Sequence, residues 1–161
     1  MAGVEEPLVE REITILRLIE GPRRLVFRAY TSAEHLGHWW GPDGFSITTH
    51  AFEFRVGGVW DFTMHGPDGT DYPNWVEWRE IVPEVRLVLE HGARAEDPQA
   101  FVSTISFVDS ERGTLVTMHA EFRTKAQRDE VVERFGAIEG GKQTLARLGV
   151  YVTDLQRDAE G

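Results

Sequence analysis

The sequence contains no cysteine among its 161 residues, which excludes disulfide bonds, thiolate metal ligands and a cysteine nucleophile. Basic residues are scarce, because 17 Lys and Arg stand against 27 Asp and Glu and give a formal net charge of -10. Binding to nucleic acid or to an anionic membrane surface depends on clustered Lys and Arg, and the sequence has no such cluster. We therefore expect neither nucleic acid nor a membrane as a partner.

Long apolar runs are also missing, since no stretch approaches the ~20 residues that span a bilayer. The start, MAGVEEPLVE, lacks the basic and apolar segments of a secretory signal, so we expect a cytoplasmic protein. Motifs of serine hydrolases, phosphate loops and dinucleotide-binding folds are absent, and we expect no cofactor. With 41% hydrophobic and 27% charged residues, the composition is typical of one globular domain, which we place over residues 1–161.

Residues 137–156 form the longest amphipathic stretch, preceded by a helical segment that is expected to begin near Thr124. Apolar residues and glycines recur three and four positions apart, at Ile138, Gly141, Leu145, Leu148, Gly149, Val152 and Leu155. This spacing predicts a helix with one apolar side, about 25–30 Å long at ~1.5 Å per residue. Each glycine lowers helix propensity by about 0.8–1.0 kcal/mol relative to alanine, which suggests that another group approaches the helix closely. That group is either a packed sheet or a ligand.

The N-terminal part predicts one strand followed by two short helices. Residues 11–20 are rich in branched side chains, and a slip in the alternation puts Leu16 and Leu18 on the apolar side. Pro22 suits the first position of a helix. Thr31 is followed three positions later by an acidic residue, which is the spacing of a capping box and predicts the start of the second helix.

From residue 45 to residue 122 the sequence is typical of strands joined by turns. Gly57-Gly58 predicts a two-residue hairpin turn, and the next strand, residues 59–65, alternates cleanly between apolar and polar side chains. Such strands pair antiparallel, and a sheet with one apolar face needs a cover. We predict an α+β fold in which one strand, two short helices and about six strands form a curved antiparallel sheet wrapped around the long C-terminal helix.

Four stretches are distinctive and occur in this order along the chain: TSAEHLGHWWGPDGF, EFRVGGVWDFTM, GPDGTDYPN and EIVPEVRLVLEHG. Together they resemble the SRPBCC (START-like) superfamily and, within it, the heat-shock chaperone ATPase activator-like family. The resemblance implies a helix-grip fold, whose sheet and C-terminal helix enclose an apolar cavity. The eukaryotic namesakes use an additional N-terminal domain to activate the chaperone ATPase, and we expect this chain to be too short to contain one.

The predicted ligand site is the space between the sheet and the C-terminal helix. Pockets for small molecules are mostly apolar, with a few polar groups that orient the ligand. The candidate ligand-binding residues are Trp39, Phe54, Trp60, Phe62, Met64, Trp75, Trp78, Met118, Leu145, Leu148, Gly149 and Val152. Taken singly, each is more typical of a closed core, but five tryptophans are many for one small domain.

Titratable residues provide no complete catalytic or metal-binding set. His35 and His38 are three positions apart on a predicted helix, which suits two metal ligands, but no third ligand is identifiable. Three acidic residues could act as general acids or bases if they faced inward: Glu53, Asp61 and Glu77. The alternation places the first two on the solvent-facing side of the sheet. Three other histidines are expected on outer faces: His50, His65 and His119. We therefore assign no metal and no catalytic residue.

Three kinds of function fit these observations. The first is binding or carriage of a small apolar or aromatic molecule, and the second is an enzyme that acts on such a molecule. The third is a protein-interaction module, such as a chaperone partner, and a homodimer is also possible. An enzyme needs a titratable group removed from water inside the pocket, a carrier needs only space, and an interaction module needs an exposed apolar patch.

Overall fold

The computed structural model describes residues 6–160, and its elements follow the predicted order. They are the 3-10 helix η1 (Leu8–Glu10), strand β1 (Glu12–Ile19), helices α1 (Arg23–Arg28) and α2 (Ala33–Trp39), strands β2 (Ser46–Phe52), β3 (Val59–His65), β4 (Asp71–Val82), β5 (Arg86–Gly92), β6 (Phe101–Ser110) and β7 (Gly113–Glu121), and helices α3 (Lys125–Phe135) and α4 (Ala137–Glu160). The start of the chain, on which the expected absence of a secretory signal rests, lies partly outside the described residues.

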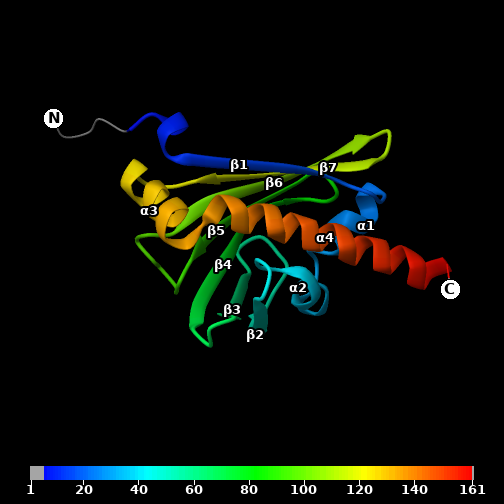
Figure 1. Ribbon diagram of the computed structural model, residues 1–161, viewed down its shortest axis with the longest axis horizontal. Coiled ribbons are helices and arrows are strands. Elements are labelled where there is room, and N and C mark those ends of the chain that lie inside the picture. Colours follow the sequence, from blue (N-terminus) through cyan, green and yellow to red (C-terminus); the bar gives the residue numbers. More distant parts are fainter. Residues whose placement is uncertain (1–5, 161) are drawn as a thin grey trace.

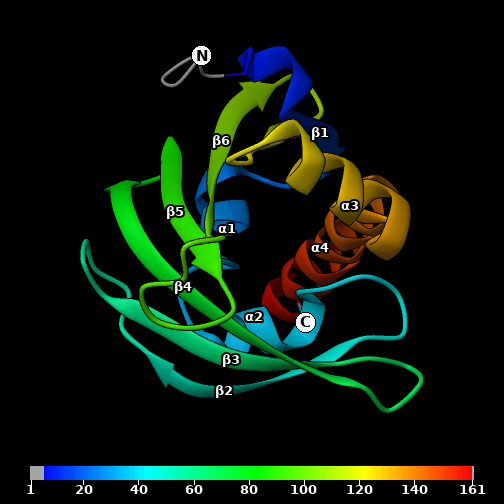
Figure 2. The ribbon, with the colours of Figure 1, turned by 90° about the vertical axis from the view of Figure 1, so that its left-hand side faces the viewer.

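The seven strands form one antiparallel sheet in the order β1-β7-β6-β5-β4-β3-β2. Strands β2 to β7 are therefore a meander, and β1 pairs with β7 at one edge of the open sheet. The sheet curls around α4, which crosses its concave side (Figures 1 and 2). This arrangement confirms the predicted α+β class and the helix-grip fold. Among the described residues, we find no helix that has both the length and the apolar character needed to span a membrane.

Strand β1 pairs with β7 without interruption from Glu12 to Ile19. The predicted slip in its alternation is wrong, because no bulge shifts the register. Leu16 and Leu18 consequently lie on the outer face, with 61% and 37% of their surface exposed. Arg17 has the inward phase instead, but it lies at the edge of the sheet, where its side chain reaches solvent beside α4.

Two local predictions near the helices and turns also need correction. Ser32, not Thr31, caps α2, because its hydroxyl accepts a hydrogen bond from the backbone N–H of His35 at 3.1 Å. Strand β2 ends at Phe52, so the connection to β3 is longer than the predicted two-residue hairpin. Gly58 is nevertheless required there, since a Cβ atom would collide with the carbonyl of a residue in the same connection.

Helices α3 and α4 cover the sheet as two separate elements. Thr124 caps α3, accepting a hydrogen bond from the backbone N–H of Gln127 at 3.0 Å, so the helical segment begins where it was predicted. Gly136 has a left-handed backbone (φ 61°, ψ 40°) and ends α3. Helix α4 then begins at residue 137, as predicted, and continues beyond residue 156 to Glu160.

The core is densely filled beside α1 and α2, which lie next to the C-terminal half of α4 (Figure 1). Leu148 and Val152 of α4 are fully buried. Tyr30 and Trp39 pack edge to face with ring centroids 4.8 Å apart, and the indole of Trp39 donates to the Ala29 carbonyl at 3.0 Å. Each such apolar side chain contributes roughly 1.5–3 kcal/mol when fully buried. This end of the concave face is therefore closed.

The two glycines of the apolar stripe have different surroundings. A Cβ atom at Gly141 would overlap Cδ1 of Ile15 and lie 3.2 Å from Cε of Met118, so α4 approaches the sheet closely there. A Cβ atom at Gly149 would lie 3.7 Å from Cδ1 of Ile19, which is an ordinary contact. Close packing against the sheet thus accounts for Gly141 but not for Gly149.

We predict that Gly149→Ala stabilises the protein by about 0.4–1 kcal/mol, because it removes backbone freedom from the unfolded chain and fits the space available. Gly141→Ala should be about 1–3 kcal/mol less stable than Gly149→Ala, because Ile15 has to move to admit the new methyl group. Urea unfolding of both variants checks the difference. Equal gains from the two substitutions would show that α4 does not touch the sheet at Gly141.

Candidate ligand-binding hollow

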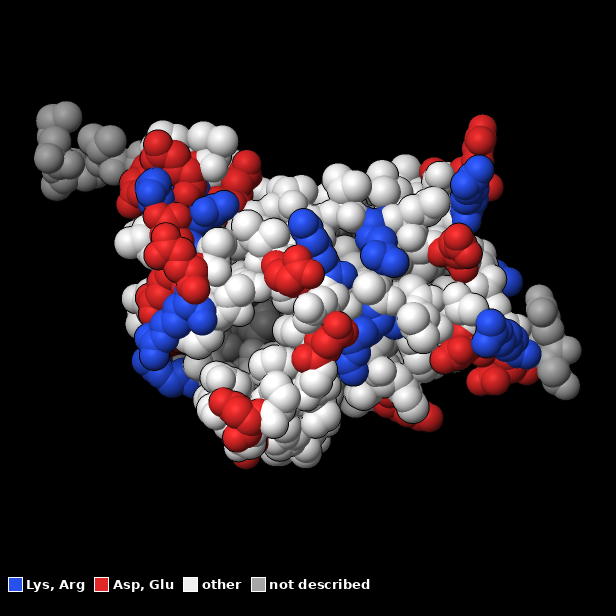
Figure 3. Space-filling view, viewed as in Figure 1, with Lys and Arg blue, Asp and Glu red and all other residues white. Residues whose placement is uncertain are grey.

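The concave side of the sheet is closed at one end and open at the other. In strands β3 to β7, inward-facing side chains are buried beside α1 and α2 and partly exposed toward α3. Along β5, Leu87 and Leu89 are buried and His91 is partly exposed; along β7, Val116 is buried and Ala120 is partly exposed. Figure 3, in the orientation of Figure 1, shows a hollow at this place, between the α3–α4 junction and β4.

At the open end, three partly exposed rings, Trp40, His91 and Phe101, adjoin the buried rings of Phe62 and Phe122. The ring centroid of Trp40, which follows α2, lies 6.2 Å from that of Phe62 and 6.4 Å from that of His91. His91 lies 5.1 Å from Phe101, and Phe101 lies 4.8 Å from Phe122, again between ring centroids. These rings come from β3, β5, β6 and the end of β7. They offer apolar faces and edges of the kind that planar ligands contact.

One polar pair interrupts this apolar lining. Nε2 of His91 on β5 lies 2.7 Å from Oδ1 of Asn74 on β4. The amide nitrogen of Asn74 donates to the Tyr72 carbonyl at 3.0 Å, which fixes the amide so that its oxygen faces the imidazole. Nε2 of His91 must therefore carry the proton that is donated to Oδ1. In a neutral ring, Nδ1 is then the unprotonated acceptor.

Burial lowers the pKa of His91 from 6.5 to about 4. The cause is the loss of hydration, which penalises the charged imidazolium more than the neutral ring. No charged side chain contributes to this shift, so the site neither attracts nor holds a proton at neutral pH. The neutral ring and its amide partner form the polar end of the hollow.

Arg147 of α4 holds the segment that carries Trp40. Its Nη1 atom donates to the carbonyl oxygens of Trp40, Gly41 and Pro42 at 3.4, 2.8 and 3.1 Å. Gly41 has a φ of 104°, a conformation that favours glycine, and this lets the segment turn back toward the helix. The arginine therefore positions one wall of the hollow rather than serving only as a polar surface residue.

We predict that Arg147→Met lowers the free energy of unfolding by about 1.5–3 kcal/mol, because three carbonyl groups lose a charged donor. Arg134→Met provides the control, since Arg134 makes an exposed pair with Glu130 at 3.4 Å and an exposed contact with the Phe135 ring, and should change stability by less than about 1 kcal/mol. Urea unfolding measures both. Similar effects from the two substitutions would contradict the assigned role of Arg147.

The structure divides the predicted site residues between the hollow and the closed core. Met64 and Met118 face inward at the open end, whereas Phe62, which contacts His91, is fully buried in the core. The following predicted residues pack into the closed core: Trp39, Phe54, Trp60, Trp78, Leu145, Leu148 and Val152. Of these, Trp60 still supports the wall, because its ring lies 5.0 Å from the ring of Trp40.

Two predicted site residues lie outside the hollow. Trp75 is on the outer face of β4 and opposite Asp61, because strand alternation turns Asn74 and Val76 inward. Gly149 lines a surface groove between β1 and α4 that also contains Arg17. The helix rotates this position toward the edge of the sheet, so a side chain placed at Gly149 would not fill the hollow.

The other titratable candidates also lie away from the hollow. Nδ1 of His35 lies 2.5 Å from the Tyr151 hydroxyl, and the ring of His38 stacks on Tyr151 at 5.1 Å, so the helical histidines join α2 to α4. Glu53 pairs with Arg55, and Glu77 pairs with Arg79, on the outer side. Over the described residues, no group of three or more His, Asp or Glu forms a metal-binding arrangement.

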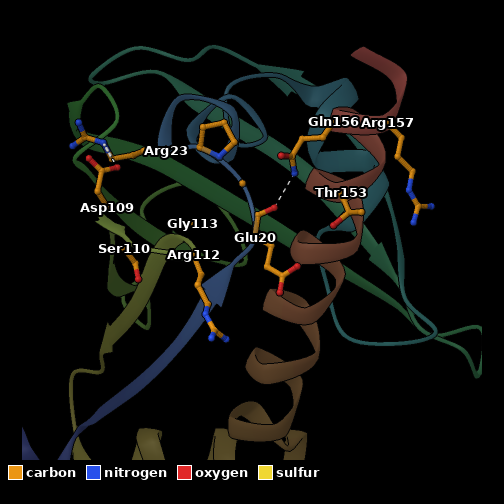
Figure 4. Close-up of a pocket in the computed structure, with 11 residues that line it drawn as sticks. Glu20, Arg23, Asp109, Ser110, Arg112, Gly113, Thr153, Gln156 and Arg157 are labelled. Carbon is orange, nitrogen blue, oxygen red and sulfur yellow. Dashed lines mark hydrogen bonds and ion pairs between the residues drawn. The ribbon is translucent and has the colours of Figure 1, made fainter. Parts of the chain in front are cut away.

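A surface groove of about 720 Å³ lies at the opposite end of the molecule (Figure 4). Arg23 pairs there with Asp109 at 3.4 Å, and Gln156 donates to the Glu20 carbonyl at 2.8 Å. Figure 4 shows Arg157 pointing away from the groove, so its charged side chains do not converge on one position. We therefore take the hollow as the candidate site.

Sequence reasoning missed His91 and Asn74. Both were visible in the alternation, because His91 continues the phase of Leu87 and Leu89 and Asn74 continues the phase of Val76. A polar residue in a buried phase needs a partner, which makes such a position informative. The pairing of the two residues depends on the register of β4 and β5, which the sequence alone does not provide.

We predict that the low pKa of His91 makes folding sensitive to acid. The neutral ring is favoured in the folded state, so its stabilising contribution is complete above pH 6.5 and is lost as the pH falls toward 4. Between pH 7 and pH 4.5 the parent should lose about 2 kcal/mol more stability than His91→Phe. Urea unfolding at both pH values measures the loss for each protein. The other titrating groups are common to both proteins, so their contributions cancel in the difference. Equal losses would mean that His91 is not buried in neutral form.

The fold and the hollow together define a small helix-grip domain that is open at one end of its sheet. The model of the family described as Activator of Hsp90 ATPase homolog 1-like protein matches residues 20–153. The chain therefore belongs to this family, which is part of the SRPBCC superfamily and was indicated by the sequence resemblance. A comparison with curated proteins finds no significant match.

Solved structures from several bacteria share the fold. A protein from Nitrosomonas europaea is similar with a TM-score of 0.83 and 27% identity, over 92% of this chain and 97% of the other. A protein from Mycobacterium smegmatis has a TM-score of 0.82 at 22% identity, over 96% and 98% of the two chains. One from Arthrobacter aurescens has a TM-score of 0.82 at 21% identity, over 95% and 92%. The last two likenesses show the fold alone.

Proposed function

We propose that the protein binds a small apolar or aromatic molecule in the hollow. The observation that carries this proposal is the change in burial along the inner face, from Leu87 and Val116 at the closed end to His91 and Ala120 at the open end. Apolar surface that stays uncovered on the concave side of a sheet is unfavourable in water, and a ligand would cover it. Membership of the family agrees with a cavity of this kind.

An enzyme acting on such a molecule is the second candidate, and His91 is the observation that favours it. The residue is a titratable group removed from water and placed at the inner surface. A base with a pKa of about 4 is a weak proton acceptor at neutral pH, however, because general bases work best near the operating pH. The geometry supports binding over catalysis. Contact with a chaperone, a homodimer and a cytoplasmic location stay predictions from the sequence.

The test combines a search for a natural ligand with a blocking variant. Native mass spectrometry of freshly purified protein should reveal a bound small molecule, and calorimetry should detect binding of 2-methoxynaphthalene as an apolar probe. Ala120→Phe places a ring on the inner face and should weaken probe binding at least about tenfold, because the ring occupies the hollow.

Thr117→Phe is the matched control, because Thr117 lies on the same strand but on the outer face. It should leave probe binding unchanged. A parent protein that carries no small molecule and binds no apolar probe would overturn the proposed function. So would an Ala120→Phe variant that binds the probe as well as the parent does.

A further inference from the structure

We propose that His91 accepts a hydrogen bond from the bound molecule through Nδ1, so that the hollow selects aromatic ligands with a hydroxyl or N–H donor. The inference rests on the proposed function, because it assigns the chemical class of the molecule bound in the hollow. Its observations are the hydrogen bonds of Asn74, the partial exposure of His91 and the aromatic rings beside it.

The direction of the Asn74–His91 hydrogen bond is fixed by the backbone. If the Asn74 amide were turned over, its oxygen would face the Tyr72 carbonyl oxygen, and two acceptors would oppose each other. In the observed orientation, each polar atom of the amide has a complementary partner. The imidazole therefore presents Nε2–H to Asn74, and its lone pair at Nδ1 has no partner within the described residues.

Nδ1 of His91 can be reached from the hollow. Within the described part of the chain, the single buried side-chain polar atom without a hydrogen-bond partner is Nε1 of Trp78. Nδ1 of His91 also lacks a partner but is not among those buried atoms. Because His91 is partly exposed and continues the inward phase of Leu87 and Leu89, the exposed part of its ring lies on the concave side. It is the acceptor that a ligand would meet beside the partly exposed rings of Trp40 and Phe101.

The same geometry disfavours an anionic ligand group at this position. Asn74 and Tyr72 orient the ring so that a lone pair, rather than an N–H, faces the hollow. A carboxylate there would lose hydration without gaining a donor. A phenol or an indole-type N–H would instead complete the hydrogen-bond chain from ligand to Nδ1 and from Nε2 to Asn74. Asn74 thus acts as a positioning residue.

The experiment compares three probes of similar shape by calorimetry: 2-naphthol, 2-methoxynaphthalene and 2-naphthoate. The parent should bind 2-naphthol about tenfold more tightly than its methyl ether, which is the upper range for one neutral hydrogen bond. In His91→Phe this ratio should fall to about one, because the acceptor is gone. His50→Phe is the matched control, since His50 is exposed on β2 and bonded to Thr63, and it should keep the parent ratio.

A second variant tests the role of Asn74 with a change that loss of structure alone would not produce. In Asn74→Asp, the carboxylate at the position of the amide stabilises a charged imidazolium, and Nδ1 becomes a donor. The preference should then move from 2-naphthol toward 2-naphthoate. Loss of binding for all three probes alike would contradict the positioning role.

The possible failures are distinguishable. If the parent binds neither 2-naphthol nor its ether, the proposed function fails and this inference fails with it. If the parent binds both equally, or binds 2-naphthoate best, the inference fails while ligand binding stands. If His91→Phe does not fold, as judged by circular dichroism, the ratios in the parent and in Asn74→Asp decide the question.

Discussion

A single helix cannot cover a seven-stranded sheet, and this constraint shapes the whole molecule. Strands lie about 4.8 Å apart, so seven of them span roughly 30 Å, whereas a helix with its side chains is only about 10–12 Å wide. The sheet therefore curls around α4, and α1 and α2 fill the concave side at one end. At the other end, α3 packs beside β1 and α4, and the inner face stays partly exposed. The hollow follows from this unequal covering.

The polar pair lies where the covering ends. A fully buried imidazole would need partners for both nitrogens, whereas a fully exposed one would not be held in a single tautomer. His91 is between these extremes: Asn74 fixes one nitrogen, and the other reaches the hollow. The surrounding rings of Trp40, Phe62 and Phe101 remove water and keep the histidine neutral. The incomplete covering of the sheet by helices thus produces both the hollow and the partly exposed histidine in it.

The sequence was sufficient for the architecture because periodicity and turn residues act locally. The clean alternation of residues 59–65 and the stripe of α4 predicted their elements with the correct boundaries or nearly so. Local patterns were misleading at the edge of the sheet, where strand pairing determines which side chains face inward. Leu16 and Leu18 lie outward because β1 is an edge strand that pairs in unbroken register. The rotation of α4 about its axis, which directs Gly149 toward β1, also required the three-dimensional packing.

The most direct measurement of the central claim is the nitrogen NMR spectrum of the His91 imidazole at neutral pH, recorded without and with 2-naphthol. The account predicts a neutral ring with the proton on Nε2, and an unprotonated Nδ1 whose resonance moves when 2-naphthol is added. The account would be contradicted by an imidazolium spectrum or by a proton on Nδ1. It would also be contradicted if 2-naphthol binds but the Nδ1 chemical shift does not change.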